Sequence, residues 1–377
     1  WERSKGDSEE AHCLSLSLLL LKEAFNLLSR IMMKKDCSLA KERANQGKPS
    51  PRMKSSIVGA MGRSSSFKKD VEKARVRKEN SMVRAAKRYN KQIVTVGQQQ
   101  RSGEIFTKTL ALCKQELGDV RKVNIWAYFP YGLGKEPFAD SPVHEGVDYD
   151  MWLGPAKERP FNKNRFHGSW RHFWDYGSGM ASDWGVHLID IGLWIEDDQK
   201  GPDKTLVYAD NTFNGIRDRD TFDTMNICFP KKNFSINYDV TAGLHKGPWK
   251  MQYGMHIVGE NGSLVLDRDK LEVIPEWDGK KDMMEAMVFD KGTDSTPNHV
   301  RNFLDCIKTR NTPACTPEMG RASAVHMHIA NIAGRVNEPV LYWDDEKNRF
   351  TNSRAANQLI TPEYRKPWTL PDIWNEY

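Results

Sequence analysis

Three residues that could move a proton, Asp183, His187 and Asp190, lie at positions i, i+4 and i+7 of one short segment. On a helix this spacing places the three side chains on one face. A histidine titrates near neutral pH, and a neighbouring carboxylate can fix which ring nitrogen carries the proton. In a partly dry cleft such a group performs general acid–base catalysis. The spacing therefore predicts an acid–base site centred on His187, although a merely solvated helix face has the same spacing.

The surrounding residues predict the helix that positions these side chains. An apolar stripe that would pack against a core runs beside the polar face: Met180, Trp184, Leu188, Ile191 and Ile195. The polar face would then border the packed one, which is where a cleft can form. The segment Trp174–Gly179 enters the helix with glycines that permit close backbone approach and leave amide donors at the helix N-terminus. Such a turn suits a polyhydroxy or anionic ligand.

Asp183, His187 and Asp190 also have the ligand types and spacing that a divalent cation could use. This leaves a metal-dependent sugar isomerase or epimerase as an alternative. His326 and His328 are two positions apart, so on a helix they point to different faces and cannot chelate one ion together. The six cysteines form no CxxC pair and have no zinc-type spacing with histidine. We therefore favour proton transfer and expect neither a bound metal nor a disulfide framework.

Length and composition indicate an ordinary soluble protein. A chain of 377 residues can form two domains, and 28% charged residues are typical of a globular fold. The net charge of +6 owes much to a basic stretch between Lys34 and Lys91, which no nucleic-acid-binding motif accompanies. The apolar run Leu14–Leu28 is interrupted by Lys22 and Glu23 and is too short to span a membrane. We expect no nucleic-acid partner and no membrane span.

The first 128 residues contain an incomplete α/β pattern. Residues 1–70 form an unassigned helical and basic segment, in which Gly59 and Gly62 fall short of a dinucleotide fingerprint. Residues 71–128 predict alternating elements: a helix at 79–89, a strand at 92–97, a helix at 103–117 and a strand at 120–128. This alternation is half of a doubly wound sheet. Because the chain opens on Trp1, we expect its natural start to be missing, and both cytoplasm and periplasm stay open as compartments.

Residues 129–340 are expected to form a second domain, entered through a linker rich in proline and glycine. Short alternating runs between residues 205 and 274 predict five or six strands in a mostly antiparallel open sheet, closed by helices at 298–308 and 321–336. Residues 341–377 show little secondary structure, but their aromatic residues suggest a tail packed along the body. The predicted fold is α/β: a partial or atypical Rossmann-like N-terminal domain followed by an α+β substrate domain.

Seven motifs carry a resemblance to a known family. They are Val94–Ser102, Tyr149–Pro155, Phe161–His167, Trp170–Gly179, Asp183–His187, His299–Ile307 and Glu363–Trp368. In this order they resemble the Gfo/Idh/MocA oxidoreductases, the family of glucose-fructose oxidoreductase and inositol dehydrogenase. The resemblance implies a Rossmann domain that binds NAD or NADP and a C-terminal domain whose open sheet often mediates homo-oligomer formation. It implies hydride transfer between the nicotinamide and a secondary alcohol of a sugar, cyclitol or glycoside.

The resemblance also assigns catalytic roles. The family's Asp and His fall on Asp183 and His187, so His187 would exchange the hydroxyl proton while Asp183 orients the substrate or the imidazole. The Lys of the family's Glu-Lys-Pro motif falls on Lys73, beside Glu72. Ala74 replaces the proline, and a non-proline cis peptide bond costs about 3–4 kcal/mol, so we expect the turn that aims the lysine to differ.

Further residues are expected to contact ligands. The expected cofactor contacts are Glu72, Gln99 and Gln100, and the expected substrate contacts are Arg165, His167, Arg171 and Asp190. For Arg171, packing against Trp170 or Trp174 is an equal alternative. The predicted partner is a small sugar or polyol. Because the glycine fingerprint is missing, a catalytically silent carbohydrate-binding or assembly protein stays open as the alternative function.

Overall fold

The computed structural model describes residues 75–211, 217–290, 292–361 and 363–368. The segment 1–70, with its glycine pair, and the expected catalytic and cofactor residues Lys73 and Glu72 lie outside the described residues. Trp374 lies outside them as well. The helices are α3 (Arg75–Arg88), α4 (Glu104–Gln115), α5 (Tyr149–Leu153), α6 (Gly179–Ile195), α7 (Thr296–Thr309), α8 (Pro317–Val336) and α9 (Arg354–Leu359). None of these described helices is both long and apolar enough to cross a membrane.

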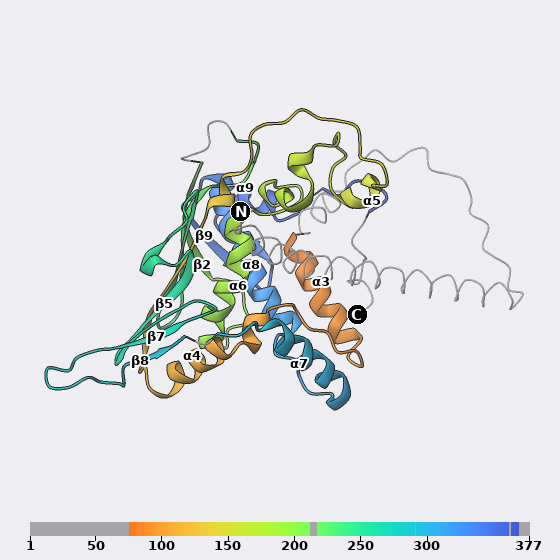
Figure 1. Ribbon diagram of the computed structural model, residues 1–377. Coiled ribbons are helices and arrows are strands. Elements are labelled where there is room, and N and C mark those ends of the chain that lie inside the picture. The colour runs from red at the N-terminus through yellow and green to blue at the C-terminus, as the bar shows by residue number, and fades with distance from the viewer. Residues whose placement is uncertain (1–74, 212–216, 291, 362, 369–377) are drawn as a thin grey trace, which may run out of the picture. The chain divides into compact units, whose positions relative to one another are not determined.

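One mixed sheet of ten strands, in the order β10-β9-β2-β3-β4-β1-β5-β6-β7-β8, dominates the described residues (Figure 1). Its strands are β1 (Val120–Phe129), β2 (Lys204–Asp210), β3 (Thr224–Pro230), β4 (Ser235–Ala242), β5 (Tyr253–Gly259), β6 (Gly262–Leu266), β7 (Leu271–Pro275), β8 (Met287–Phe289), β9 (Val340–Asp344) and β10 (Arg349–Phe350). The β1–β4 pair is parallel, and the other pairs are antiparallel. The predicted mostly antiparallel sheet is confirmed.

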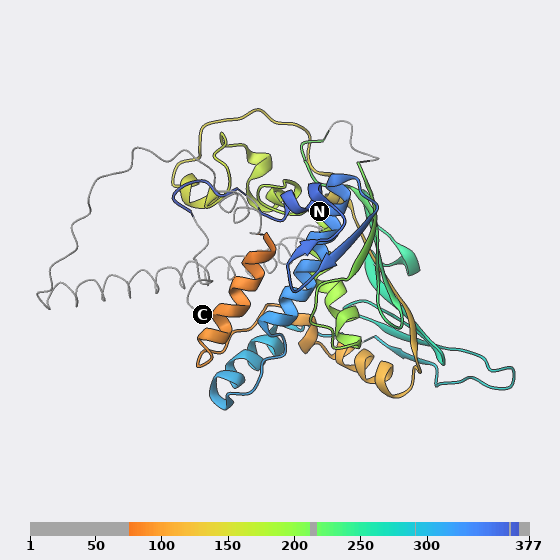
Figure 2. The same cartoon turned by 180° about the vertical axis from the view of Figure 1, so that it is seen from behind.

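The sheet has one covered face and one open face. In β4 every second residue is buried, so Ile236, Tyr238 and Val240 point into the core while their neighbours point outward. The long helices α6 and α8 lie against the covered face (Figures 1 and 2). Strong alternation in the sequence thus defines which side of each strand carries the core.

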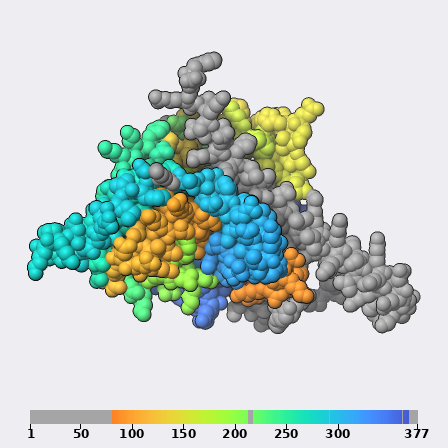
Figure 3. Space-filling view, turned by 60° about the horizontal axis from the view of Figure 1, so that its bottom comes forward, coloured from red at the N-terminus to blue at the C-terminus, as the bar shows by residue number. Residues whose placement is uncertain are grey.

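Helix α6 confirms the predicted helix, and its apolar stripe packs as expected. Met180, Trp184 and Leu188 are all buried in the main core. Helix α8 begins earlier than predicted because Thr316 caps it, accepting a hydrogen bond from the Met319 backbone nitrogen, with Pro317 in the first turn. In the space-filling view of Figure 3, the orange surface of α4 and the blue surface of α7 lie next to each other.

The segment Gln92–Gly97 is not a strand, which corrects the prediction. It is extended but held by other elements: the Val96 nitrogen donates to the Cys315 carbonyl at 3.0 Å, and the Val96 carbonyl lies 2.9 Å from His299 Nε2. The strand expected beside it, β1, lies instead in the middle of the large sheet, between β4 and β5. The half-Rossmann pairing predicted for residues 71–128 is therefore wrong, because a short apolar run does not specify which partner it joins.

The C-terminal tail has more structure than predicted. Strand β9 pairs with β2 and extends the sheet, β10 pairs with β9, and α9 follows. Trp343 is buried on β9, as expected for an aromatic residue that packs on the body. The run Val340–Asp344 alternates between buried and more exposed residues, as a strand does. Turns beside this short run made the strand harder to predict from the sequence.

Candidate active site

His187 lies in the middle of α6 and is 8% exposed. Its Nδ1 atom is buried and has no hydrogen-bond partner among the described residues. Burial, and to a smaller extent the positive charge of Arg268, lower the pKa of His187 to about 3. The imidazole is therefore neutral at physiological pH and can accept a proton, and no described residue pairs with its Nδ1 atom.

Asp183 is held by Arg171 and does not orient His187. The Arg171 Nε atom lies 3.0 Å from both carboxylate oxygens of Asp183, and both side chains are almost fully buried. No hydrogen bond joins Asp183 to His187 in the described part of the chain. Burial raises the pKa of Asp183, while Arg171 acts in the opposite direction. Of the two roles expected for Asp183, a hydrogen bond that orients the imidazole is not present among the described residues, and orientation of the substrate stays a prediction. The pairing with a residue from the preceding loop was not visible in the helical spacing.

Arg171 packs against Trp170, one of the two alternatives considered for it, while its expected contact with substrate stays a prediction. Its guanidinium lies 4.7 Å from the centroid of the Trp170 ring and also pairs with Asp183. The glycine turn wraps around it: a Cβ on Gly177 would lie 2.7 Å from the Arg171 carbonyl oxygen. Gly179 has φ +76°, and a Cβ there would lie 2.8 Å from Thr221. These glycines are therefore explained by close packing.

Asp190 forms a buried structural ion pair. Its carboxylate accepts from Arg101 at 2.7 and 3.1 Å and from the Ser323 hydroxyl at 2.9 Å. Asp190 is 1% exposed, and the Arg101 guanidinium also stacks on Trp194. The expectation that Asp190 contacts substrate is corrected, because its carboxylate is already occupied by side chains from two other elements.

An aromatic floor lies beside His187, made of Phe129, Trp184 and Tyr253. The Phe129 and Trp184 rings stack at 4.4 Å, and those of Trp184 and Tyr253 lie 4.5 Å apart. Arg268 covers this floor, with its guanidinium 5.0 Å from the Trp184 ring and 5.7 Å from the Tyr253 ring. No motif or spacing pointed to Arg268, since it is a single arginine in the turn between β6 and β7.

The glutamines expected near the cofactor lie beside this site. They belong to the short 3-10 helix η1 (Gln99–Ser102), which the preceding Gln98 anchors by donating from Nε2 to the Val186 carbonyl at 2.7 Å. Gln100 Oε1 accepts from Arg268 Nη2 at 3.3 Å. Gln99 Oε1 and Gln100 Nε2 are buried without a partner in the structure as described. These two buried atoms are one acceptor and one donor, so a polar ligand could satisfy them.

Residues 119–370 match the model of an oxidoreductase family, specifically the C-terminal alpha/beta domain of the Gfo/Idh/MocA group. The chain belongs to the Gfo/Idh/MocA oxidoreductase family. Solved structures share the fold. An oxidoreductase from Agrobacterium radiobacter, in complex with NAD+, L-tartaric acid and magnesium, aligns with a TM-score of 0.50 and 13% identity over 71% of this chain and 70% of its own. A candidate NADPH-dependent oxidoreductase from Desulfitobacterium hafniense aligns with a TM-score of 0.51 and 12% identity, over 70% and 69% of the two chains. A comparison with curated proteins gives no match.

In this Gfo/Idh/MocA chain the remaining expected substrate residues are not gathered around His187. Arg165 donates to Asp140 Oδ1 at 2.7 Å and to the Pro160 carbonyl at 3.0 Å, which ties its own loop together. His167 is exposed, with φ 43° and its ring against Phe166. Within the described segments no hydrogen bond or ion pair joins either residue to the His187 surroundings.

The metal-dependent alternative needs Asp183 and Asp190 as ligands, but other side chains already bind both carboxylates. Asp183 and Asp190 are each paired with an arginine, on Arg171 and Arg101. No group of three His, Cys, Asp or Glu side chains that could hold a metal ion occurs in the part of the chain that the structure describes. The donor set therefore does not support the isomerase alternative.

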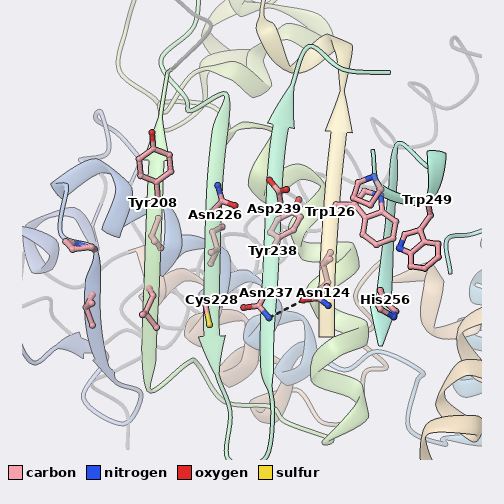
Figure 4. Close-up of a pocket in the computed structure, with 17 residues that line it drawn as sticks. Asn124, Trp126, Tyr208, Asn226, Cys228, Asn237, Tyr238, Asp239, Trp249 and His256 are labelled. Atoms are coloured by element: carbon pink, nitrogen blue, oxygen red, sulfur yellow. Dashed lines mark hydrogen bonds between the residues drawn. The ribbon is translucent and has the colours of Figure 1, made fainter. Parts of the chain in front are cut away.

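A second concave surface of about 650 Å³ lies on the open face of the sheet (Figure 4). Asn124 and Asn237 are joined there by a hydrogen bond of 3.4 Å, and Asp239 lies above Asn237 on the same strand (Figure 4). Tyr208 and Trp249 line its rim and are 57% and 49% exposed. This groove and His187 are on opposite sides of the sheet, so it is separate from the candidate active site.

Proposed function

We propose that this protein is an NAD(P)-dependent oxidoreductase that acts on a secondary alcohol of a sugar, cyclitol or glycoside, with His187 as the acid–base group. The observation that carries the proposal is a neutral, buried imidazole whose Nδ1 atom has no partner in the described residues, beside an aromatic floor and unpaired amides. A mostly apolar surface with a few convergent polar groups is typical of a site for a small organic ligand.

The described residues fit a nicotinamide cofactor. Gln99 Oε1 can accept and Gln100 Nε2 can donate a hydrogen bond, and both atoms are buried without a partner among the described residues. A nicotinamide carboxamide carries the complementary donor and acceptor. The bound nicotinamide would supply the hydride chemistry. The proposed cofactor contacts are Gln99, Gln100 and, outside the described residues, Glu72, with Lys73 as a third catalytic group.

His187 would receive the proton of the substrate hydroxyl during oxidation and return it during reduction. Its helix fixes it against the core, so little reorganisation is needed when substrate binds. The floor of Phe129, Trp184 and Tyr253 would exclude water beneath the reacting carbon. The Arg171–Asp183 pair would hold the wall of the site in place, because it joins the loop before α6 to the helix.

The test of this function is the variant His187→Gln, with His245→Gln as the matched control because that histidine is exposed to solvent. Formation of reduced cofactor is followed by absorbance with NAD and NADP and a panel of sugars and polyols. We expect His187→Gln to lower kcat by roughly 100- to 10,000-fold while the control keeps full activity. Equal turnover by wild type and His187→Gln would refute the role of His187. Sugar binding without any turnover or cofactor dependence would favour the catalytically silent alternative.

We also propose that the open face of the sheet joins two copies of the chain. Its rim exposes Tyr208 and Trp249, and large exposed aromatic side chains are enriched at protein interfaces. Light scattering of wild type and of the double variant Tyr208→Glu, Trp249→Glu tests this. We expect an oligomer for wild type and a smaller species for the variant. A monomeric wild type would refute the proposal.

A further inference from the structure

The charges around His187 are balanced except for one. Asp183 is paired with Arg171, and Asp190 is paired with Arg101, so each buried carboxylate has its own arginine. Arg268 makes no ion pair with a carboxylate of the described residues, and its one side-chain hydrogen bond there is to the neutral Gln100 amide. Its Nε atom is buried with no partner in the described structure. The carboxylate of the neighbouring Asp269 interacts with the charge of Arg268 but forms no ion pair with it. A partly buried guanidinium with no paired carboxylate among the described residues is costly, which points to an anion that arrives with a ligand.

The turn that carries Arg268 is well defined. Asp267 Oδ1 accepts hydrogen bonds from the backbone nitrogens of Asp269 and Lys270 at 2.8 and 2.9 Å, which fixes the connection between β6 and β7. From this turn the guanidinium lies over the rings of Trp184 and Tyr253. The two rings and the Gln100 amide restrict where the guanidinium lies, and a planar guanidinium can bind a carboxylate or phosphate through two parallel hydrogen bonds.

We propose that Arg268 binds an oxyanion of the substrate, so that the preferred substrates are acidic sugars or polyols that carry a carboxylate or phosphate group. This inference rests on the proposed function, since it places the anionic group of the substrate beside His187. It narrows the substrate class from sugars in general to those with a negative charge near the reacting hydroxyl.

Anion binding at Arg268 would also make His187 a stronger base. Burial is the first cause that lowers the pKa of His187, and the charge of Arg268 is the second. The other charged groups nearby are the internally paired Asp183–Arg171 and Asp190–Arg101, and the carboxyl of Asp269, which interacts with the charge of Arg268. An oxyanion on Arg268 would cancel the second cause and raise the pKa of His187 towards the range in which it can accept a proton. The substrate's own charge would thereby favour catalysis.

Binding without cofactor tests the inference directly. Full-length protein is titrated in a calorimeter with glucuronate, glucose 6-phosphate, glucose and inorganic pyrophosphate. We expect at least one of the two sugar anions to bind at least 10-fold more tightly than glucose. We expect Arg268→Gln to weaken that binding by roughly 10- to 100-fold, the loss typical of a charged hydrogen-bond pair, and Arg268→Lys to weaken it less. Arg121→Gln, which removes an arginine that is 56% exposed, is the matched control. Circular dichroism verifies that every variant is folded.

A spectroscopic readout separates recognition from structural effects. The histidine rings are isotope-labelled, and the NMR signal of His187 is assigned as the one that disappears in His187→Gln. This signal is then followed through a pH titration. We expect the pKa of His187 to rise when the sugar anion binds, and to rise in ligand-free Arg268→Gln. Equal affinity for glucose and the sugar anions, or anion binding that survives Arg268→Gln, would overturn the inference. Pyrophosphate that binds through Arg268 more tightly than either sugar anion would also overturn it, by assigning the residue to cofactor phosphates.

The inference and the proposed function fail in different ways. If Arg268→Gln oxidises neutral sugars as fast as wild type and no anion binds, the oxidoreductase stands and the substrate class is wrong. If sugar anions bind through Arg268 but no cofactor is reduced under any condition, the proposed function fails while the binding site stands.

Discussion

Arg101 and Asp190 join three elements through one buried ion pair. Arg101 lies in η1 and donates through Nε and Nη2 to the Asp190 carboxylate of α6, at 2.7 and 3.1 Å. Ser323 of α8 donates to the same carboxylate. The pair therefore fixes the position of η1, with its two unpaired glutamine amides, against the helix that carries His187. Asp190 thus supports the candidate active site by holding η1 against α6.

Asp190→Asn should destabilise the protein by about 3–5 kcal/mol, because it leaves Arg101 buried without a counter-charge. The double variant Arg101→Met, Asp190→Leu should recover most of that loss, since it removes both charges and keeps the volume. Ser323→Ala removes a single hydrogen bond and should cost about 1 kcal/mol. Urea unfolding at pH 7 measures all three. An Asp190→Asn protein as stable as wild type would mean that the carboxylate serves ligand binding and not the fold.

The Arg171–Asp183 pair should show strong energetic coupling. We expect Arg171→Gln and Asp183→Asn each to destabilise the protein, and a double-mutant cycle to give a coupling energy of about 0.5–3 kcal/mol, as for residues in direct contact. A coupling energy near zero would contradict the pairing. The same variants measured with cofactor and sugar test the proposed site wall, for which we expect kcat to fall more than stability explains.

The sequence predicted those helices and strands whose apolar residues repeat with a regular period. Helix α6 and the strands β2 to β7 were predicted because the period of their apolar residues reports which side is buried. The strand expected at Gln92–Gly97 failed because three apolar residues between turns are compatible with any extended segment that packs on a neighbour. Its partners, Cys315 and His299, are distant in sequence.

The candidate site could be predicted only in part, for the same reason. The motif around Asp183 and His187 located the helix and its histidine. The partners that decide the roles of the carboxylates, Arg171 and Arg101, come from other segments, and helical spacing contains no information about them. Arg268 is a lone arginine in a turn, and it gains significance only because the sheet brings that turn over Trp184.

Gly185, in the centre of the family motif, should be intolerant of alanine. A Cβ at this position would lie 2.5 Å from Met327 Sδ and 2.9 Å from Tyr238 Cε1, where α6 crosses both α8 and β4. We expect Gly185→Ala to destabilise the protein by about 1–3 kcal/mol through overpacking. The double variant Gly185→Ala, Met327→Ala should relieve part of this. Gly192→Ala is the matched control, because its Cβ would meet only the flexible end of Ile236 at 3.1 Å. If both glycine variants unfold at the same urea concentration as wild type, close packing does not explain Gly185.

Acid should destabilise the protein through its buried neutral histidines. Burial lowers the pKa of His187 to about 3, that of His172 to about 4, and that of His326 well below 6.5. When pH falls below 6.5 the unfolded chain binds protons on these rings and the folded protein does not, so the free energy of unfolding decreases. For each such histidine the loss is about 1.4 kcal/mol per pH unit, until the pH reaches the pKa in the folded protein.

Comparison of wild type with His187→Gln isolates the contribution of one ring, because all other titrating groups are common to both proteins. Urea unfolding at pH 6.5, 5.5 and 4.5 should show that the stability of wild type relative to His187→Gln decreases by about 1.4 kcal/mol per unit. His245→Gln provides the matched control at an exposed position. A difference that stays constant over this range would mean that His187 is protonated in the folded protein as readily as in the unfolded chain. The imidazole would then not be the desolvated, neutral group on which the proposed chemistry depends.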